Sequence, residues 1–292
     1  MKKKSTYVFI NIIIMIISIM FVAKMGYNLN YIKININIIS NIILILLIIL
    51  IVLSLKFLRM YLILLEEKLS IKRFIKVYIK SVFATVCIPF KLGEFFRMYC
   101  YAYEVKSVKK GIISVIIDRY FDTIALILIL VPMEIYITNG LSLISIMLSL
   151  FIGIITILYL SLMPMINYLN KFIVLNVFSE KGIRILKFLD KLEGVYLECE
   201  KLINGKIVVL LMLFSCTAWI LEYIAIYSIS SLFQIYVNKN GFTIYLSSML
   251  VGRGNELVSI YSTIEMILLA ISTFSIYGVY YYKNLKNRRE SF

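Results

Sequence analysis

The chain has 292 residues, of which 62% are hydrophobic and only 16% are charged. A soluble domain is about 45–50% apolar and about 25% charged, so one water-soluble core cannot bury this surplus of apolar side chains. The composition excludes a soluble enzyme, a disordered tail and a fibrous repeat. It predicts an all-α, polytopic membrane protein in which residues 1–292 form a single integral membrane domain.

Several kinds of chemistry are excluded by counting. The chain has no histidine, which rules out an imidazole base and a histidine-ligated metal. The four cysteines are widely spaced without a CxxC pair, which argues against a zinc site or a disulfide framework. The net charge of +15 fits loops that face anionic lipid head groups, because no base-stacking module of a nucleic-acid-binding protein is present. We expect no cofactor, no metal and no nucleic-acid partner.

Six stretches are long and apolar enough to cross the membrane as helices, which takes about 20 residues each. They are Tyr7–Ala23, Ile38–Leu55, Gly111–Thr138, Leu141–Ile166, Ile207–Phe233 and Leu257–Tyr282. The first lacks a small-residue cleavage site and is too long for a signal peptide, so we interpret it as a retained anchor.

Two further apolar segments are too short or too interrupted to be full spans. Phe74–Phe90 runs into the charged segment Lys91–Arg97, and Phe242–Val251 runs into Gly252–Glu256. Each ends in a turn that contains glycine and charged residues. Irregular backbone at membrane depth is tolerated only where protein or a water-filled cavity satisfies it. We therefore predict two re-entrant elements.

The basic residues are segregated by loop. The two termini and the loops 56–80, 91–110 and 167–206 hold 26 of the 31 lysines and arginines. Cytoplasmic loops carry this excess, so we expect a cell-membrane protein with both termini in the cytoplasm. Within 167–206, leucines recur at near-helical spacing among mixed charges, which predicts an amphipathic cytoplasmic helix or hairpin.

The predicted topology divides into two inverted halves, residues 1–140 and 141–292, joined by the segment 167–206. Such halves are a recurrent plan of transporters. A short sequence echo supports the division: Lys91–Tyr99 and Arg253–Tyr261 each have a glutamate followed five residues later by a tyrosine. A match this short also arises by chance, so the repeat stays a hypothesis.

Several charged side chains lie within the predicted membrane segments, where a charge near the bilayer centre costs about 2.5–3.5 kcal/mol. The candidate residues are Lys91, Glu94, Arg97, Asp118, Arg119, Asp122, Glu222, Arg253 and Glu256, with Glu265 as a further partner or a neutral carboxyl. Two interpretations stay open: a self-neutralising cluster that fixes helix packing, or a polar cavity that holds a lipid head group. For Glu222, Arg119 and Arg253 are the candidate partners.

The spacing of these charges places several on shared helix faces. Asp118 and Asp122 are four residues apart, while Arg119 and Asp122, like Glu94 and Arg97, are three apart. A guanidinium such as that of Arg97 suits bidentate binding of a phosphate. Glu94 is placed to orient Arg97 or to accept a ligand amine.

At residues 89–122 the sequence resembles the lysylphosphatidylglycerol synthase transmembrane family. The resemblance rests on Pro89-Phe90-Lys91-Leu92-Gly93-Glu94-Phe95-Phe96-Arg97 followed by Asp118-Arg119-Tyr120-Phe121-Asp122. That family, which includes the flippase-like domain of the multiple peptide resistance factor, carries a Pro-Gly-x-x-Gly-Glu-x-x-Arg-like turn and a Glu-Arg-x-x-Asp-like helix. Here Phe90 replaces the first glycine and Asp118 replaces the glutamate. The resemblance implies that Glu94, Arg97, Asp118, Arg119 and Asp122 line a head-group cavity.

Three functions follow as hypotheses. The first is a translocase, or flippase, for an anionic or aminoacylated phospholipid. The second is a lipid-modifying enzyme of the phosphatidylglycerol lysyltransferase type. The third is a non-catalytic membrane partner of a separately encoded lipid-modifying enzyme. In full-length synthases of the family a cytoplasmic acyltransferase domain transfers lysine from lysyl-tRNA, and we expect no segment of this chain to form that domain. Whether the chain is an enzyme, and its oligomeric state, stay open.

Overall fold

A computed structural model describes residues 36–87, 92–138, 140–176, 180–203, 205–233 and 256–289. Regular secondary structure in these ranges is helical throughout, which confirms the predicted all-α class. The elements are α2 (Ile36–Ile63), the 3₁₀ turn η2 (Leu65–Glu67), α3 (Ile71–Cys87), α4 (Leu92–Val105), α5 (Val108–Thr138), α6 (Leu143–Asn176), α7 (Glu180–Leu202), α8 (Gly205–Phe233) and α10 (Glu256–Arg289).

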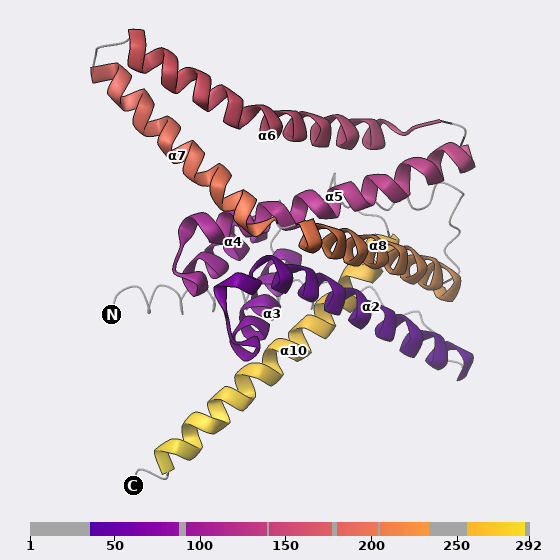
Figure 1. Cartoon of the computed structure of the whole chain (residues 1–292). Helices are drawn as coiled ribbons and strands as arrows, with labels where there is room; N and C mark the ends of the chain where they lie inside the picture. The colour runs from indigo at the N-terminus through magenta and orange to yellow at the C-terminus, as the bar shows by residue number, and fades with distance from the viewer. Residues whose placement is uncertain are drawn as a thin grey trace.

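The helices α2, α5 and α8 form the centre of the molecule (Figure 1). They pack against one another, with α2 on α8 the most extensive contact. α3 and α4 lie together at one end of α2 and α5, and α10 crosses past α3 and α8. Helices contributed by distant parts of the sequence therefore converge on the middle of α5.

Two hydrophobic clusters hold this arrangement together. The first joins α2, α5, α8 and α10 through buried aliphatic side chains such as Ile49, Leu130 and Ile226. The second joins the C-terminal end of α2 to α3, α4 and α5 around Phe74 and Tyr101. Burying each large apolar side chain stabilises the fold by about 1.5–3 kcal/mol. Charged side chains that lie between the clusters are consequently held in a firmly packed frame.

Three described helices are long and apolar enough to cross a membrane: Ser40–Ile63, Leu143–Leu175 and Gly205–Phe233. They coincide with three of the predicted spans, although the first two extend further than predicted. A shorter apolar stretch, Ile260–Ser275, lies in α10. These helices support a membrane-embedded protein, while the predicted span Tyr7–Ala23 lies outside the described residues.

The segment around residues 71–105 is more regular than predicted. It forms two helices, α3 and α4, which pack closely against each other. The stretch 92–97, expected as a turn, is the first part of α4, so Glu94 and Arg97 lie on a helix. Helix formation satisfies the backbone N–H and C=O groups within the segment, which an irregular turn between apolar surfaces would leave exposed. The second predicted re-entrant segment, Phe242–Val251, lies outside the described residues.

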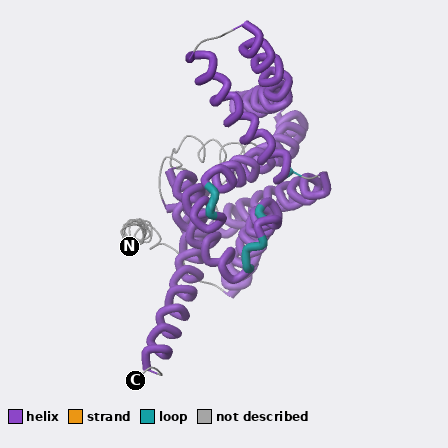
Figure 2. Tube along the Cα trace, turned by 60° about the vertical axis from the view of Figure 1, so that its left-hand side comes forward, coloured by secondary structure: helices purple, strands orange, loops and turns teal. Residues whose placement is uncertain are grey.

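α6 and α7 form a helical arm that projects from the central helices (Figure 2). They pack through Ile166, Ile173 and Leu189. The described residues of the segment 167–206 are largely helical, as predicted, while its cytoplasmic position stays a prediction. α6 continues as a helix to Asn176, past Ile166, the predicted end of the preceding span. α7 returns the chain to α5 before α8 begins.

The crossing of α4 and α5 depends on a glycine. A Cβ atom added at Gly111 would lie 2.3 Å from the backbone nitrogen of Ala102, whereas one added at Gly153 in α6 meets nothing within 4 Å. We predict that Gly111→Ala lowers the free energy of unfolding by about 1–3 kcal/mol through overpacking. The matched control, Gly153→Ala, should leave it unchanged or raise it by up to about 1 kcal/mol.

Thermal unfolding of the purified variants in detergent tests this difference. A Gly111→Ala protein that unfolds at the wild-type temperature would contradict the close crossing.

Candidate functional site

Two aspartates near the middle of α5 form the centre of the candidate site. Asp118 and Asp122 lie one helical turn apart, with 0% and 7% of their surface exposed. At about 1.5 Å per residue they lie roughly 15 and 21 Å from the start of α5, which is well inside a hydrocarbon core of about 30 Å if α5 spans the membrane. Two carboxylates this close and this buried require cationic partners.

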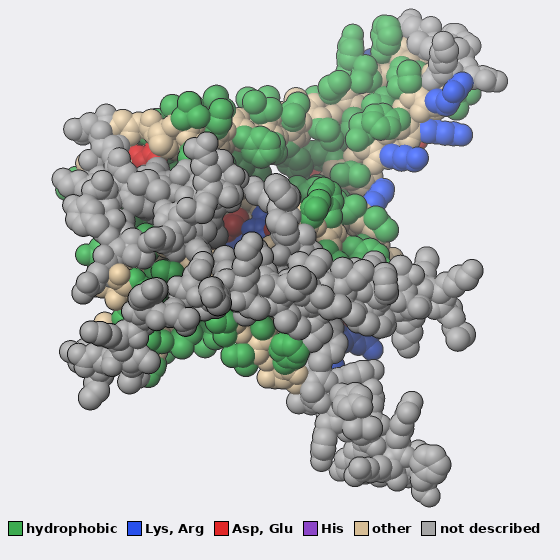
Figure 3. Space-filling view, turned by 180° about the vertical axis from the view of Figure 1, so that it is seen from behind, with side chains coloured by type: hydrophobic (Ala, Val, Ile, Leu, Met, Phe, Trp, Pro, Cys, Tyr) green, Lys and Arg blue, Asp and Glu red, His purple; other side chains and the backbone are tan. Residues whose placement is uncertain are grey.

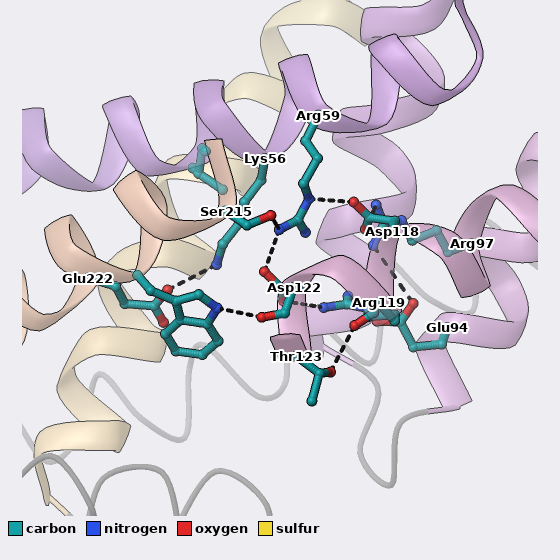
Figure 4. A network of polar contacts seen from close by, with 12 residues as sticks. Lys56, Arg59, Glu94, Arg97, Asp118, Arg119, Asp122, Thr123, Ser215 and Glu222 are labelled. Atoms are coloured by element: carbon teal, nitrogen blue, oxygen red, sulfur yellow. Dashed lines mark hydrogen bonds and ion pairs between the residues drawn. The ribbon is translucent and has the colours of Figure 1, made fainter. Parts of the chain in front are cut away.

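Arg59 of α2 supplies the first partner. Its Nε donates to Oδ1 of Asp118 at 2.6 Å, and its Nη1 donates to Oδ1 of Asp122. Nη1 also donates to the Ser215 hydroxyl of α8 at 2.9 Å. Only 2% of Arg59 is exposed, so one buried guanidinium connects α2, α5 and α8 (Figure 4).

Arg97 of α4 supplies the second partner. Its Nη2 donates to the remaining carboxylate oxygen of Asp118 at 2.9 Å, and its Nη1 lies 3.8 Å from Oε2 of Glu94. The guanidinium also lies 5.9 Å from the centre of the Tyr101 ring, in the range of a cation–π contact. Each oxygen of the Asp118 carboxylate is therefore bound by a different arginine.

One end of the network is accessible. The Arg119 side chain is 45% exposed and pairs with Oε1 of Glu94, whose side chain is 21% exposed. Nη1 of Arg119 also lies 3.6 Å from Oδ2 of Asp122. Among the described atoms on the face drawn in Figure 3, acidic and basic side chains are visible together near the middle. The pair Arg119–Glu94 is thus partly accessible, as is the side chain of Lys56, which is 25% exposed.

The other end of the network lies between α2, α8 and α10. Nζ of Lys56 donates to Oε2 of Glu222 at 3.1 Å. Trp219, three residues before Glu222 on α8, donates from its Nε1 to the backbone carbonyl of Asp122 at 3.1 Å. Glu265 of α10 is 8% exposed and lies close enough to interact electrostatically with Lys56 and Glu222. The charge network therefore continues from α5 towards α10.

Most of the predicted site residues come together. The structure joins Glu94, Arg97, Asp118, Arg119 and Asp122 in one network. Spacing predicted the pairs within each helix, whereas only the family resemblance implied that residues of both helices lie together. Glu222 belongs to the same network. It was predicted to pair with Arg119 or Arg253, but in the described residues its ion pair is with Lys56. Sequence spacing could not reveal this partner, because it comes from a different helix.

Three predicted site residues remain without a described side chain. Lys91 and Arg253 lie outside the described residues, and Glu256 begins α10 without a described side chain. Their assignment to the site stays a prediction.

Lys56, Arg59 and Ser215 were not predicted as site residues. The two cations were assigned to the cytoplasmic loop 56–80, whereas α2 continues to Ile63 and buries Arg59. The spacing of the sequence could have revealed the two cations, because positions 45, 49, 52, 56, 59 and 63 follow one face of a helix. The apolar residues of that set are buried. Extending the helical period past the first lysine would have placed both cations on the core face.

Within the described residues, no group of cysteine, aspartate and glutamate side chains is arranged to hold a metal ion. The carboxylates of the network are instead arranged around guanidinium and ammonium groups, which suits charged organic groups.

The family model described as "Lysylphosphatidylglycerol synthase TM region" matches residues 9–254. The chain belongs to this family. The match confirms the resemblance carried by the motifs on α4 and α5, and it supports a membrane protein related to lysylphosphatidylglycerol synthases. No curated protein and no solved structure shows a significant match. Glu265 lies beyond the matched residues of the family, whereas the rest of the described network lies within them.

The buried arginine and a half-buried lysine offer a matched test of the network. Arg59→Met leaves two buried carboxylates without their shared cation, so we predict a loss of about 3–5 kcal/mol in unfolding free energy. Lys110→Met breaks the pair with Glu67, whose side chains are 31% and 18% exposed, and should cost about 0–1 kcal/mol.

Thermal unfolding and the yield of folded protein in detergent measure both effects. Equal losses of unfolding free energy in the two variants would show that burial of the Arg59 ion pairs adds nothing to stability.

Proposed function

We propose that the chain is a translocase that moves a phospholipid with an anionic or aminoacylated head group between the leaflets of the cell membrane. The observation that carries the proposal is the division of the charge network into a sealed part and an accessible part. Arg59, Arg97 and Asp118 are buried and mutually paired, while Arg119 and Glu94 are partly exposed. A purely structural cluster has no need of an accessible end.

The accessible end suits both charges of a phospholipid head group. A phosphate would exchange for Glu94 on the guanidinium of Arg119, because arginine binds phosphate with a bidentate fork. An amine of an aminoacylated head group would bind the released Glu94 carboxylate and Asp122. The sealed pairs would hold α2, α4 and α5 in place during this exchange.

The surrounding topology is part of the proposal. We propose six membrane spans with both termini in the cytoplasm, α3 and α4 as a re-entrant hairpin, and two inverted halves that open alternately. The chain contains no GxxxxGK[ST] phosphate-binding motif, so a gradient, a potential or removal of the lipid product would drive transport.

A role in lipid synthesis is the second candidate, because the matching family model is described as the transmembrane region of a synthase. In that case the chain would modify lipid or present it to a separately encoded enzyme. Total lipid composition separates the two: a translocase changes the leaflet distribution of a lipid, whereas a synthase component changes its amount.

We predict that Arg119→Gln and Glu94→Gln each slow translocation by about 10- to 100-fold. Losing a hydrogen bond to a charged group costs about 1.5–3 kcal/mol, and each 1.4 kcal/mol is a factor of ten. The matched control is Lys201→Gln, which removes a lysine that is 68% exposed on the arm. The control should translocate lipid at the wild-type rate.

The assay uses proteoliposomes containing tail-labelled phosphatidylglycerol or its lysyl ester, with a membrane-impermeant reductant to bleach the outer leaflet. If the reductant bleaches neither labelled lipid faster in vesicles with wild-type protein than in protein-free vesicles, the proposed function is overturned.

A further inference from the structure

The charged residues of α3 all have the same sign. Four of its 17 residues are basic, Lys72, Arg73, Lys76 and Lys80, and none is acidic. The three lysines follow one another at intervals of four residues, so they lie along one side of the helix. Lys72, Arg73 and Lys76 are exposed, and Lys80 is half-buried. These four residues form the basic face of α3.

The opposite face of α3 is buried against the end of α2. Phe74 and Tyr78 are 0% and 3% exposed, and they belong to the same hydrophobic cluster as Ile63, the last residue of α2. The candidate membrane span of α2, Ser40–Ile63, ends at this residue. With α2 as a membrane span, the first turns of α3 are held where the span leaves the hydrocarbon core. The basic face of α3 therefore lies at the level of the lipid head groups.

Large apolar side chains accompany these cations. Ile71 of α3 is 56% exposed, and Leu65 of the preceding turn η2 is 46% exposed. Lys68, which is also exposed, lies between them in the sequence. A helix that rests on a lipid surface combines basic residues for anionic head groups with apolar side chains that enter the boundary between head groups and acyl chains. The combination on α3 indicates a lipid surface rather than a nucleic acid.

We propose that the basic face of α3 is a binding surface for the phosphate groups of anionic phospholipids in the leaflet at this end of α2. The ammonium group of lysine is a point charge on a flexible stem, which suits head groups that exchange with the surrounding bilayer. Each basic residue close to an anionic lipid surface strengthens binding by about fivefold. The inference concerns the lipids around the protein, so it does not depend on the proposed translocation.

The helix α7 offers a matched contrast. It also exposes three cations, Arg184, Lys187 and Lys191. Its 23 residues include five basic and five acidic ones, so the charges of α7 cancel. Removing three cations from α3 or from α7 changes the net charge of the protein equally. Only the removal from α3 should change the lipids that α3 binds.

The experiment uses full-length protein in which the photoreactive amino acid p-benzoylphenylalanine replaces Ile71. The protein is placed in proteoliposomes that contain equal amounts of phosphatidylglycerol and phosphatidylcholine with the same acyl chains. Both lipids contain a phosphate group, but only phosphatidylglycerol has a net negative charge. After irradiation, mass spectrometry counts the adducts of each lipid. At low salt we expect phosphatidylglycerol adducts to exceed phosphatidylcholine adducts by about fivefold or more.

Two changes should lower this adduct ratio to about one. The first is Lys72→Gln, Arg73→Gln and Lys76→Gln made together, whereas glutamine at the three exposed cations of α7 should leave the ratio unchanged. The second is an increase in salt to about 0.5 M, because salt screens exposed charges. The salt series uses protein with all its cations, so it does not depend on the folding of either triple variant.

Three results would overturn the proposal. The first is an equal yield of the two lipid adducts at low salt in protein that keeps its cations. The second is an equal fall of the ratio in the two triple variants, which would show that the net charge of the whole protein selects the lipid. The third is a cross-link from position 71 to a second copy of the chain in place of lipid. None of these results depends on whether the protein translocates lipid.

Discussion

The rest of the structure depends on the buried guanidinium of Arg59. Asp118 and Asp122 lie one turn apart on α5, where two negative charges without a counter-charge would repel each other in a medium that screens them poorly. Arg59 binds both and adds a hydrogen bond to Ser215, so α2, α5 and α8 are fixed relative to one another. Arg97 then attaches α4 to the same aspartate. The pairing of the buried charges and the packing of the helices are consequently determined together.

Sequence reasoning succeeded where the information was local. Charges at i, i+3 and i+4 within α4 and α5 share a helix face in any helix, so the grouping of Glu94 with Arg97 and of Asp118 with Asp122 followed from spacing alone. It failed where the partner came from another helix. Counting basic residues by loop assigned Arg59 to a loop because it follows a long apolar run, yet the helix continues and buries it. The counter-charge of a buried carboxylate is a tertiary property, and spacing within one segment does not contain it.

The network also separates two tasks that the sequence presented as alternatives. A cluster that fixes helix packing and a cavity that holds a head group were competing interpretations of the same residues. The buried pairs around Asp118 fit the first, and the accessible pair Arg119–Glu94 fits the second.

The central claim is that these charges move a phospholipid across the membrane rather than make one. Leaflet-resolved labelling combined with lipid mass spectrometry, in cells with and without the gene, tests it most directly. The account predicts that total amounts stay constant while one anionic or aminoacylated lipid is lost from the outer leaflet of the deletion strain. Disappearance of a lipid from the total extract would contradict the account and identify the chain as part of a synthesis reaction.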